Sequence, residues 1–244
     1  DIQRRNALSE SMIVQLISSL EQATLDPSVS VIVISSKGSV FCSGHDLKEI
    51  TNAREEADHG KAFFTKLMTL CSNLMQTIVK CPKPVIAEIS GVATAAGCQL
   101  VASCDLAYAA EEAKFCTPGV NIGLFCSTPM VAVSRSISQK NSMEMLLTGD
   151  MISADRAEEI GLINRSTPMK DLEATVTLIA KKIASKSSPT VKIGKKAFYA
   201  QKEMDLDQAY KHTSKVMVEN LFYEDAKEGI SAFLEKRDPD WNDR

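Results

Sequence analysis

Long hydrophobic runs and an excess of positive charge are both missing from this sequence. None of its apolar stretches reaches the roughly 18–20 residues that a membrane-crossing helix needs, so no membrane span is expected. Lysine and arginine total 28 against 31 aspartates and glutamates, a net charge of −3, and the basic residues are scattered. This balance gives no electrostatic reason to expect nucleic acid as a partner.

Histidine is scarce, and the cysteines form no paired motif. The three histidines, His45, His59 and His212, are too far apart in the sequence to suggest a ligand cluster, so no metal is expected. The seven cysteines are odd in number, include no C-x-x-C pair and stand mostly in apolar stretches. This usage predicts buried free thiols in a reducing compartment and argues against a disulfide framework or a zinc site.

The composition is that of a globular chain large enough for one α/β domain with a helical extension. Of the 244 residues, 44% are apolar and 24% are charged. Apolar, β-branched runs predict strands over residues 29–35, 85–90 and 105–109. The alternation of strand, turn and helix up to residue 127 favours an α/β architecture, and the pattern beyond it is nearly all helical.

The predicted helices begin and end at recognisable signals. Ser9 is a candidate N-cap for the first helix, which is expected to end near Asp26 and Pro27. The polar stretch over residues 51–60 is expected to be a mobile surface segment. Apolar periodicity predicts the other helices over residues 63–80, 97–103, 128–138, 142–147, 153–159, 171–185, 190–201, 206–221 and 223–236.

Two turns carry most of the functional information. They are residues 41–48 (FCSGHDLK) and 91–100 (GVATAAGCQL). Each turn follows an apolar β-branched run and leads towards a helical pattern, so each can aim free backbone N–H groups at one point. Two such donors make an oxyanion hole.

In residue identity and spacing, these turns resemble those of the enoyl-CoA hydratase (crotonase) superfamily. The resemblance is closest at residues 83–91 (KPVIAEISG) and extends to residues 153–157, 161–164 and 227–236. It implies an α/β crotonase (ClpP/crotonase-like) fold of repeated ββα units, with a C-terminal helical region that assembles homotrimers, often stacked as dimers of trimers. We therefore expect a crotonase core over residues 1–185 and a helical oligomerisation region over residues 186–244.

The first residues match the middle of the family pattern. Residues 4–8 (RRNAL) normally follow an opening hairpin, so the first strands and a targeting segment are expected to precede this sequence. The resemblance also implies a mitochondrial location and a role in fatty acid metabolism.

The resemblance assigns the oxyanion hole to two main-chain donors. The N–H groups of His45 and Ala96 would polarise the carbonyl of an acyl-CoA thioester. Residues 94–97 (TAAG) stand where the family usually has a glycine-rich run. Alanine keeps the N–H donor, but its Cβ tolerates fewer backbone angles and can narrow the hole.

The two glutamates that a hydratase uses fall here on Gln99 and Gly119. Glutamine can orient a water but cannot exchange a proton near neutral pH, and glycine offers no side chain. Because each positioned acid or base contributes about 10²–10⁴ in rate, we expect hydration to be weak or absent. If the pocket admits glutamate at both positions, the double variant is expected to recover part of it. The carboxylates of Asp46, Glu88 and Glu144 occupy no matching catalytic position.

The resemblance also assigns contacts to coenzyme A, which is expected as part of the ligand and not as a permanent cofactor. Lys48, with its neighbours Asp46 and Leu47, matches a segment that contacts a CoA phosphate, although a solvated lysine is equally compatible. Phe233 and Lys236 match residues that reach the adenine and phosphate in a neighbouring subunit. Phe233 also fits a simple apolar stripe in its helix.

Three activities remain open at this point. The first is hydratase-like turnover of an acyl-CoA with weak acid–base groups. The second is decarboxylation of a malonyl-type acyl-CoA, which needs mainly enolate stabilisation. His45 and residues 117–123 (TPGVNIG) resemble the methylmalonyl-CoA decarboxylase branch of the superfamily. The third is non-catalytic acyl-CoA binding or regulation, which the empty position 119 favours over efficient hydration.

Overall fold

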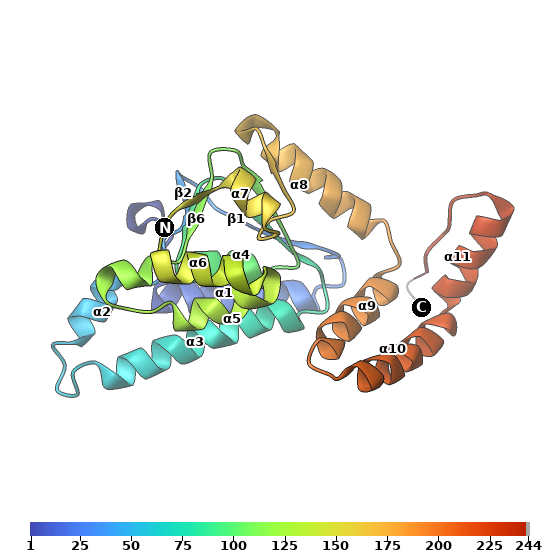
Figure 1. Ribbon diagram of the computed structural model, residues 1–244. Helices are drawn as coiled ribbons and strands as arrows, with labels where there is room; N and C mark the ends of the chain where they lie inside the picture. Colours follow the sequence, from blue (N-terminus) through green and yellow to red (C-terminus); the bar gives the residue numbers. More distant parts are fainter. Residues whose placement is uncertain (243–244) are drawn as a thin grey trace.

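The computed structural model describes residues 1–242 and contains two sheets that alternate along the chain (Figure 1). Within these residues the first sheet has the order β1-β3-β5-β8, with all neighbours parallel. Its strands are β1 (Ile32–Ser35), β3 (Val85–Ile89), β5 (Leu106–Ala110) and β8 (Arg165–Thr167). The second sheet has the order β2-β4-β6-β7, and its strands are β2 (Val40–Cys42), β4 (Val92–Thr94), β6 (Lys114–Cys116) and β7 (Ile152–Ser153).

Strands β1, β3 and β5 of the first sheet are each followed by a strand of the second sheet and then by helix, whereas β8 leads directly into α8. This order repeats as β1-β2 before α2 and α3, as β3-β4 before α4, and as β5-β6 before α5. The predicted crotonase-type α/β fold of repeated ββα units is confirmed. The bounds of these helices are α2 (Leu47–Ala53), α3 (Lys61–Lys80), α4 (Ala96–Ser103) and α5 (Ser127–Ser136).

The remaining helices are α1 (Glu10–Leu25), α6 (Gln139–Thr148), α7 (Ala154–Glu159), α8 (Met169–Ala184), α9 (Ser188–Gln201), α10 (Leu206–Leu221) and α11 (Glu224–Glu235). Two short 3₁₀ segments, η1 (Ile2–Arg4) and η2 (Pro118–Ile122), complete the secondary structure of the described residues. None of these helices combines the length and the hydrophobicity that crossing a bilayer requires.

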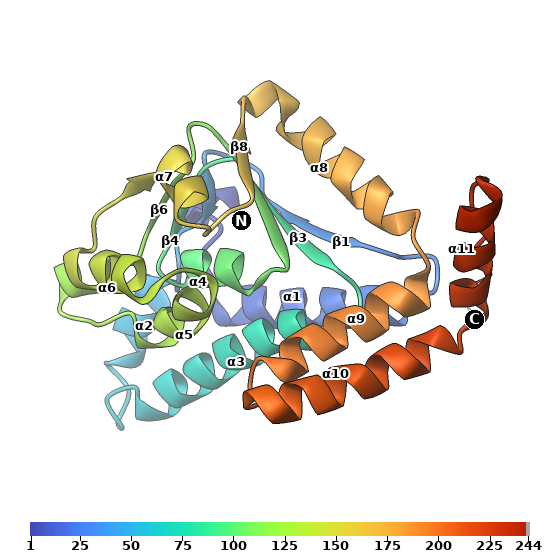
Figure 2. The same cartoon turned by 45° about the vertical axis from the view of Figure 1, so that its right-hand side comes forward.

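The core lies between the two sheets and the helices that pack on them. Strand β3 is buried along almost its whole length, because it is central in its sheet and both faces are covered. One face contributes to a large cluster with α1, α3 and α4, and α8 covers the other face (Figure 2). Helix α1 begins where the sequence indicates, since the Ser9 hydroxyl accepts a hydrogen bond from Met12 N–H at 3.2 Å.

The second sheet and strand β8 of the first sheet were not predicted from the sequence. The strands β2, β4, β6, β7 and β8 each contain two or three residues, too few for a periodic signal, and their positions are set by their partners. The predicted strand over residues 29–35 begins at Ile32, and the first residues of the predicted surface segment over 51–60 belong to α2.

The C-terminal helices leave the body of the molecule. Helix α9 is fastened to it by Lys195, whose buried ammonium contacts Asp105 at 2.6 Å and the Ile78 and Lys83 carbonyl oxygens. Helix α10 packs on α9 and has no buried residue, and α11 lies at the edge of the molecule in both views (Figures 1 and 2). Large apolar side chains on these two helices and in the segment that joins them are exposed, including Phe222 at 83% and Phe233 at 82%.

Candidate functional site

The first turn runs from the end of β2 to the start of α2. Gly44 has φ 85°, a left-handed conformation that reverses the chain directly after the strand. His45 then forms a parallel bridge with Leu8, and the Asp46 carboxylate caps α2 by accepting the Lys48 N–H at 2.8 Å. The His45 main chain is thus fixed between a bridge and a helix cap.

The second turn joins β4 to α4 through a strained residue. Ala95 has φ 50° and ψ −117°, a conformation that residues with a Cβ rarely adopt. Its N–H donates to the Cys116 carbonyl oxygen at 2.9 Å, which ties the turn to β6. This backbone conformation sets the orientation of the next peptide. Helix α4 then starts at Ala96, whose N–H points out of the N-terminal end of the helix.

The two turns are packed against each other. The Thr94 hydroxyl donates to the Ser43 carbonyl oxygen at 2.9 Å. A Cβ placed on Gly44 would lie 3.4 Å from Ala96 N, and one placed on Gly97 would lie 2.2 Å from the Cys42 carbonyl oxygen. Such an approach is possible because neither glycine has a side chain.

The structure therefore brings His45 and Ala96 together at one place. Neither N–H has a hydrogen-bond partner within residues 1–242. Two backbone donors that are left unpaired in neighbouring, packed turns are available to an acceptor atom of a ligand.

The His45 side chain is mostly buried beside the same turn. Its Nδ1 lies 3.3 Å from the Leu8 carbonyl oxygen, and its Nε2 is buried without a hydrogen-bond partner in the described part of the chain. Burial lowers the pKa of this imidazole, while the Leu8 carbonyl and the Glu49 carboxylate raise it in part. The ring is thereby kept neutral at a pH near 7.

Gln99 faces the interior and already has a contact there. Its side chain is 4% exposed, and its Oε1 accepts a weak hydrogen bond from the Cys71 thiol at 3.7 Å. Burial raises the pKa of Cys71 to about 12, so this sulfur stays a protonated thiol.

Position 119 has no room for a side chain. A Cβ on Gly119 would lie 2.8 Å from the Leu124 carbonyl oxygen and 3.0 Å from the Cys126 Sγ. The Gly119 N–H also donates to that sulfur at 3.4 Å. The expectation that a glutamate at this position would recover hydration therefore needs the loop over residues 119–126 to move.

The seven cysteines are free, and all except Cys104 are buried, which confirms the predicted buried thiols. Burial raises the pKa of Cys42 and Cys116 to about 11 each.

Within residues 1–242 no group of three or more His, Cys, Asp or Glu side chains is placed to hold a metal ion.

Comparison with known proteins identifies the family. The sequence profile of the enoyl-CoA hydratase/isomerase family matches residues 1–244. The chain belongs to the enoyl-CoA hydratase/isomerase family.

Relatives within this family are similar over nearly the whole chain. The rat protein "Enoyl-CoA hydratase domain-containing protein 3, mitochondrial" is 48% identical over 98% of this chain and 78% of its own length. The "Enoyl-CoA hydratase, mitochondrial" of Pongo abelii is 33% identical over 98% of this chain and 80% of its own length. The crystal structure of human enoyl coenzyme A hydratase domain-containing protein 3 superposes with a TM-score of 0.94 at 46% identity, covering 99% of this chain and 93% of that chain. The mitochondrial location expected from the resemblance is confirmed by these relatives.

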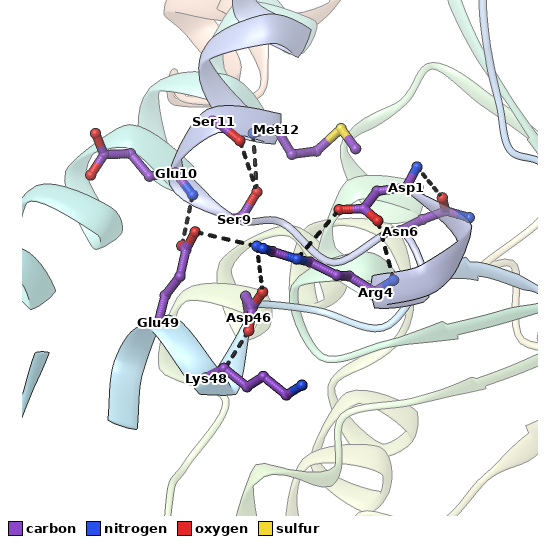
Figure 3. A network of polar contacts seen from close by, with 10 residues as sticks. All are labelled: Asp1, Arg4, Asn6, Ser9, Glu10, Ser11, Met12, Asp46, Lys48 and Glu49. Carbon is purple, nitrogen blue, oxygen red and sulfur yellow. Dashed lines mark hydrogen bonds and ion pairs between the residues drawn. The ribbon is translucent and has the colours of Figure 1, made fainter. Parts of the chain in front are cut away.

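The segment expected to contact coenzyme A in this family lies at the start of α2. Asp46 is buried, and its other oxygen pairs with Arg4 at 3.3 Å, so this carboxylate holds the helix start and the N-terminal segment together (Figure 3). Leu47 is 54% exposed, and the Lys48 side chain is exposed with its ammonium away from the network. Lys48 is free to meet an anionic ligand, and Asp46 is not.

The C-terminal pair is not near the two turns. Phe233 and Lys236 stand on and just after α11, which lies on the other side of the molecule from α2 (Figure 1). Phe233 is 82% exposed, so apolar packing within residues 1–242 covers little of its side chain. This placement separates α11 from α2 of the same chain.

Two residues that matter for the site were missed in the sequence. Ala95 is one, because its left-handed conformation sets the direction of the Ala96 N–H. The sequence did contain a signal for this conformation, because alanine stands here within a segment where the family usually has glycines. Cys126 is the other, because its sulfur fills the space next to position 119, and no sequence pattern marks it.

Proposed function

We propose that this chain binds acyl-CoA thioesters in mitochondrial fatty acid metabolism, with the thioester oxygen between the N–H groups of His45 and Ala96. The observation that carries the proposal is the pair of unpaired backbone donors in two packed turns. An oxygen with developing negative charge satisfies both donors at once, and such preorganised donors are worth several kcal/mol in a site that excludes water.

The same proposal makes this protein a poor hydratase. Hydration needs one group that removes a proton from water and another that delivers a proton to carbon. Gln99 can do neither near neutral pH, and its oxygen contacts Cys71. Position 119 has neither a side chain nor the space for one. Acyl-CoA binding with little turnover follows from this combination.

The proposed CoA moiety lies along the start of α2. Lys48 offers a free cation for a phosphate, and Leu47 offers an exposed apolar side chain next to it. Phe233 and Lys236 would complete the site from a neighbouring copy, because their own chain holds them far from these residues. The exposed apolar side chains of α10 and α11 support assembly into a homotrimer or a dimer of trimers.

Binding and turnover are tested together on one panel of ligands. Butyryl-CoA, crotonyl-CoA and malonyl-CoA are titrated calorimetrically into the purified protein, and each reaction is followed by mass spectrometry. We expect binding of all or some of these esters with little hydration. Fast decarboxylation of the malonyl ester would instead select the decarboxylase, and no binding of any ester would refute the proposal.

The assembly is measured on the same preparation by light scattering. A trimer or hexamer at micromolar concentration is expected, because two helices with this much exposed apolar surface need cover. A monomer would contradict the part of the proposal in which Phe233 and Lys236 of a neighbouring copy complete the site.

A further inference from the structure

The chain turns back after α11 and runs along that helix. Figure 1 shows this return on the side of α11 that faces α8 and α9. Lys236 ends the helix in a left-handed conformation with φ 57°, and the Arg237 N–H donates to the Ala232 carbonyl oxygen at 3.0 Å. This geometry reverses the direction of the chain. We call residues 236–242 the C-terminal strap.

Polar contacts fasten the strap to one face of α11. The Arg237 guanidinium donates to both carboxylate oxygens of Glu228, at 2.5 and 2.9 Å. Further along the strap, the main-chain N–H of Asp240 donates to Glu228 at 2.9 Å. The main-chain N–H of Asn242 donates to Asp225 at 2.8 Å. Because Asp225 and Glu228 are three residues apart in a helix, the strap follows a single face of α11.

Trp241, the only tryptophan in the sequence, links the strap to the body of the molecule. Its indole Nε1 donates to the Ser185 carbonyl oxygen at 2.9 Å, and Ser185 caps the C-terminal end of α8. The ring also lies against Gly229 of α11, where a Cβ would be 3.0 Å from the Trp241 Cη2. Because glycine has no side chain, one indole can contact both α11 and the end of α8.

Helix α11 depends on such contacts for its position. It has 12 residues, and a helix of that length is marginal in water without tertiary packing. Within residues 1–242 its buried residues are Asp225 and Ala232, whereas Ile230, Phe233 and Leu234 are 53–82% exposed. The buried face of α11 is therefore the one that the strap follows, and its apolar side chains add little packing.

We propose that the C-terminal strap sets the position of α11 relative to α8, with Trp241 as the positioning residue. The indole hydrogen bond to Ser185 and the contact with Gly229 hold the two helices together at one separation. This inference goes beyond the proposed acyl-CoA binding and does not depend on it. It also explains what holds Phe233 and Lys236 in place, because these residues belong to α11 or directly follow it.

Hydrogen exchange of the full chain, followed by mass spectrometry, tests the position of α11. Trp241→Ala should speed exchange over residues 224–235 about tenfold or more and leave β3 unchanged, because one hydrogen bond and the ring contact are lost together. Trp241→Phe keeps a ring and loses the N–H donor, so its exchange should lie between those of the wild type and Trp241→Ala. Unchanged exchange of α11 in Trp241→Ala would overturn the inference.

The fluorescence of the single tryptophan gives a second measurement, which leaves Trp241 in place. Gly229→Leu should push the ring away from α11, so that the indole meets water and its emission moves to longer wavelength. Gly194→Leu on α9 is the matched control, because a Cβ there has nothing within 4 Å, and it should leave the emission unchanged. The same emission in Gly229→Leu as in the control would overturn the inference.

Titration of the same proteins with butyryl-CoA separates this inference from the proposed function. Faster exchange of α11 in Trp241→Ala together with weaker ester binding would support both the strap and the share of a neighbouring copy in the CoA site. Faster exchange with unchanged affinity would support the strap and contradict the proposed contact of Phe233 and Lys236 with CoA. Unchanged exchange would overturn the strap whatever the affinity.

Discussion

The candidate site has a donor side, the N–H groups of His45 and Ala96, and an acid–base side, Gln99 and Gly119. The two sides differ in whether these groups are free to contact a ligand. On the donor side, the N–H groups of His45 and Ala96 are unpaired in the described chain, and the turns that carry them are packed together. On the acid–base side, Gln99 contacts Cys71, and the space at Gly119 is filled by neighbours. Under the proposed function, main-chain donors are kept when side chains are replaced, whereas two substitutions are enough to remove an acid–base pair.

The largest effect on stability is expected from a variant that places a carboxylate at position 119. Gly119→Glu should destabilise the protein by about 3 kcal/mol or more, because its Cβ would collide with the Leu124 carbonyl and the Cys126 sulfur. Crotonyl-CoA hydration should not rise. Thermal unfolding measures the first effect and a steady-state assay the second. The matched control is Gly194→Glu on α9, where a Cβ has nothing within 4 Å. Equal stability of the two variants would show that position 119 has room.

A smaller effect is expected from loosening the donor side. Thr94→Val removes the hydroxyl that donates to the Ser43 carbonyl oxygen and keeps the shape of the side chain. We expect butyryl-CoA to bind about fivefold more weakly, equivalent to about 1 kcal/mol for one hydrogen bond. Calorimetric titration measures the change. Thr69→Val is the control, because that hydroxyl bonds to Thr65 within α3, far in sequence from both turns. A similar loss in both variants would mean that the link between the turns is irrelevant to binding.

An effect of similar size, but of opposite sign and on stability, is expected from relaxing the strained turn at Ala95. Ala95→Gly should raise the free energy of unfolding by about 1 kcal/mol, because glycine adopts φ 50° without the strain of a Cβ. For a chain of this size the melting temperature should rise by about 2–4 °C. Ala95→Val should lower it, since a β-branched residue tolerates this conformation less well. A lower melting temperature for Ala95→Gly would show that Ala95 is not strained.

The architecture was predicted from the family resemblance that the sequence carries, and the assignment of His45 and Ala96 as donors also came from that resemblance and stays a prediction. The block at residues 83–91 and the glycines near 44 and 97 are local signals, because a buried strand and a tight turn are read from neighbouring residues. The first helix also followed from a local signal, the cap at Ser9. What could be predicted depended on contacts between residues close in the sequence.

The parts that could not be predicted depend on tertiary contacts. Strand β8 has three residues, and its register comes from pairing with β5, which places Arg165 beside Tyr108. The filling of position 119 comes from a sulfur seven residues away, across a turn. The conformation of Ala95 is imposed by the Cys116 carbonyl and by the approach of the first turn. None of these contacts has a signature in the amino-acid pattern.

The rate of crotonyl-CoA hydration by the purified wild-type protein tests the central claim most directly. The measurement compares it, under the same conditions, with a hydratase that has both glutamates, and binding of butyryl-CoA is recorded on the same preparation. With the donors kept and the acid–base pair absent, we predict thioester binding together with a hydration rate lower by about 10⁴-fold or more. Hydration at a rate near that of the two-glutamate enzyme would contradict the account.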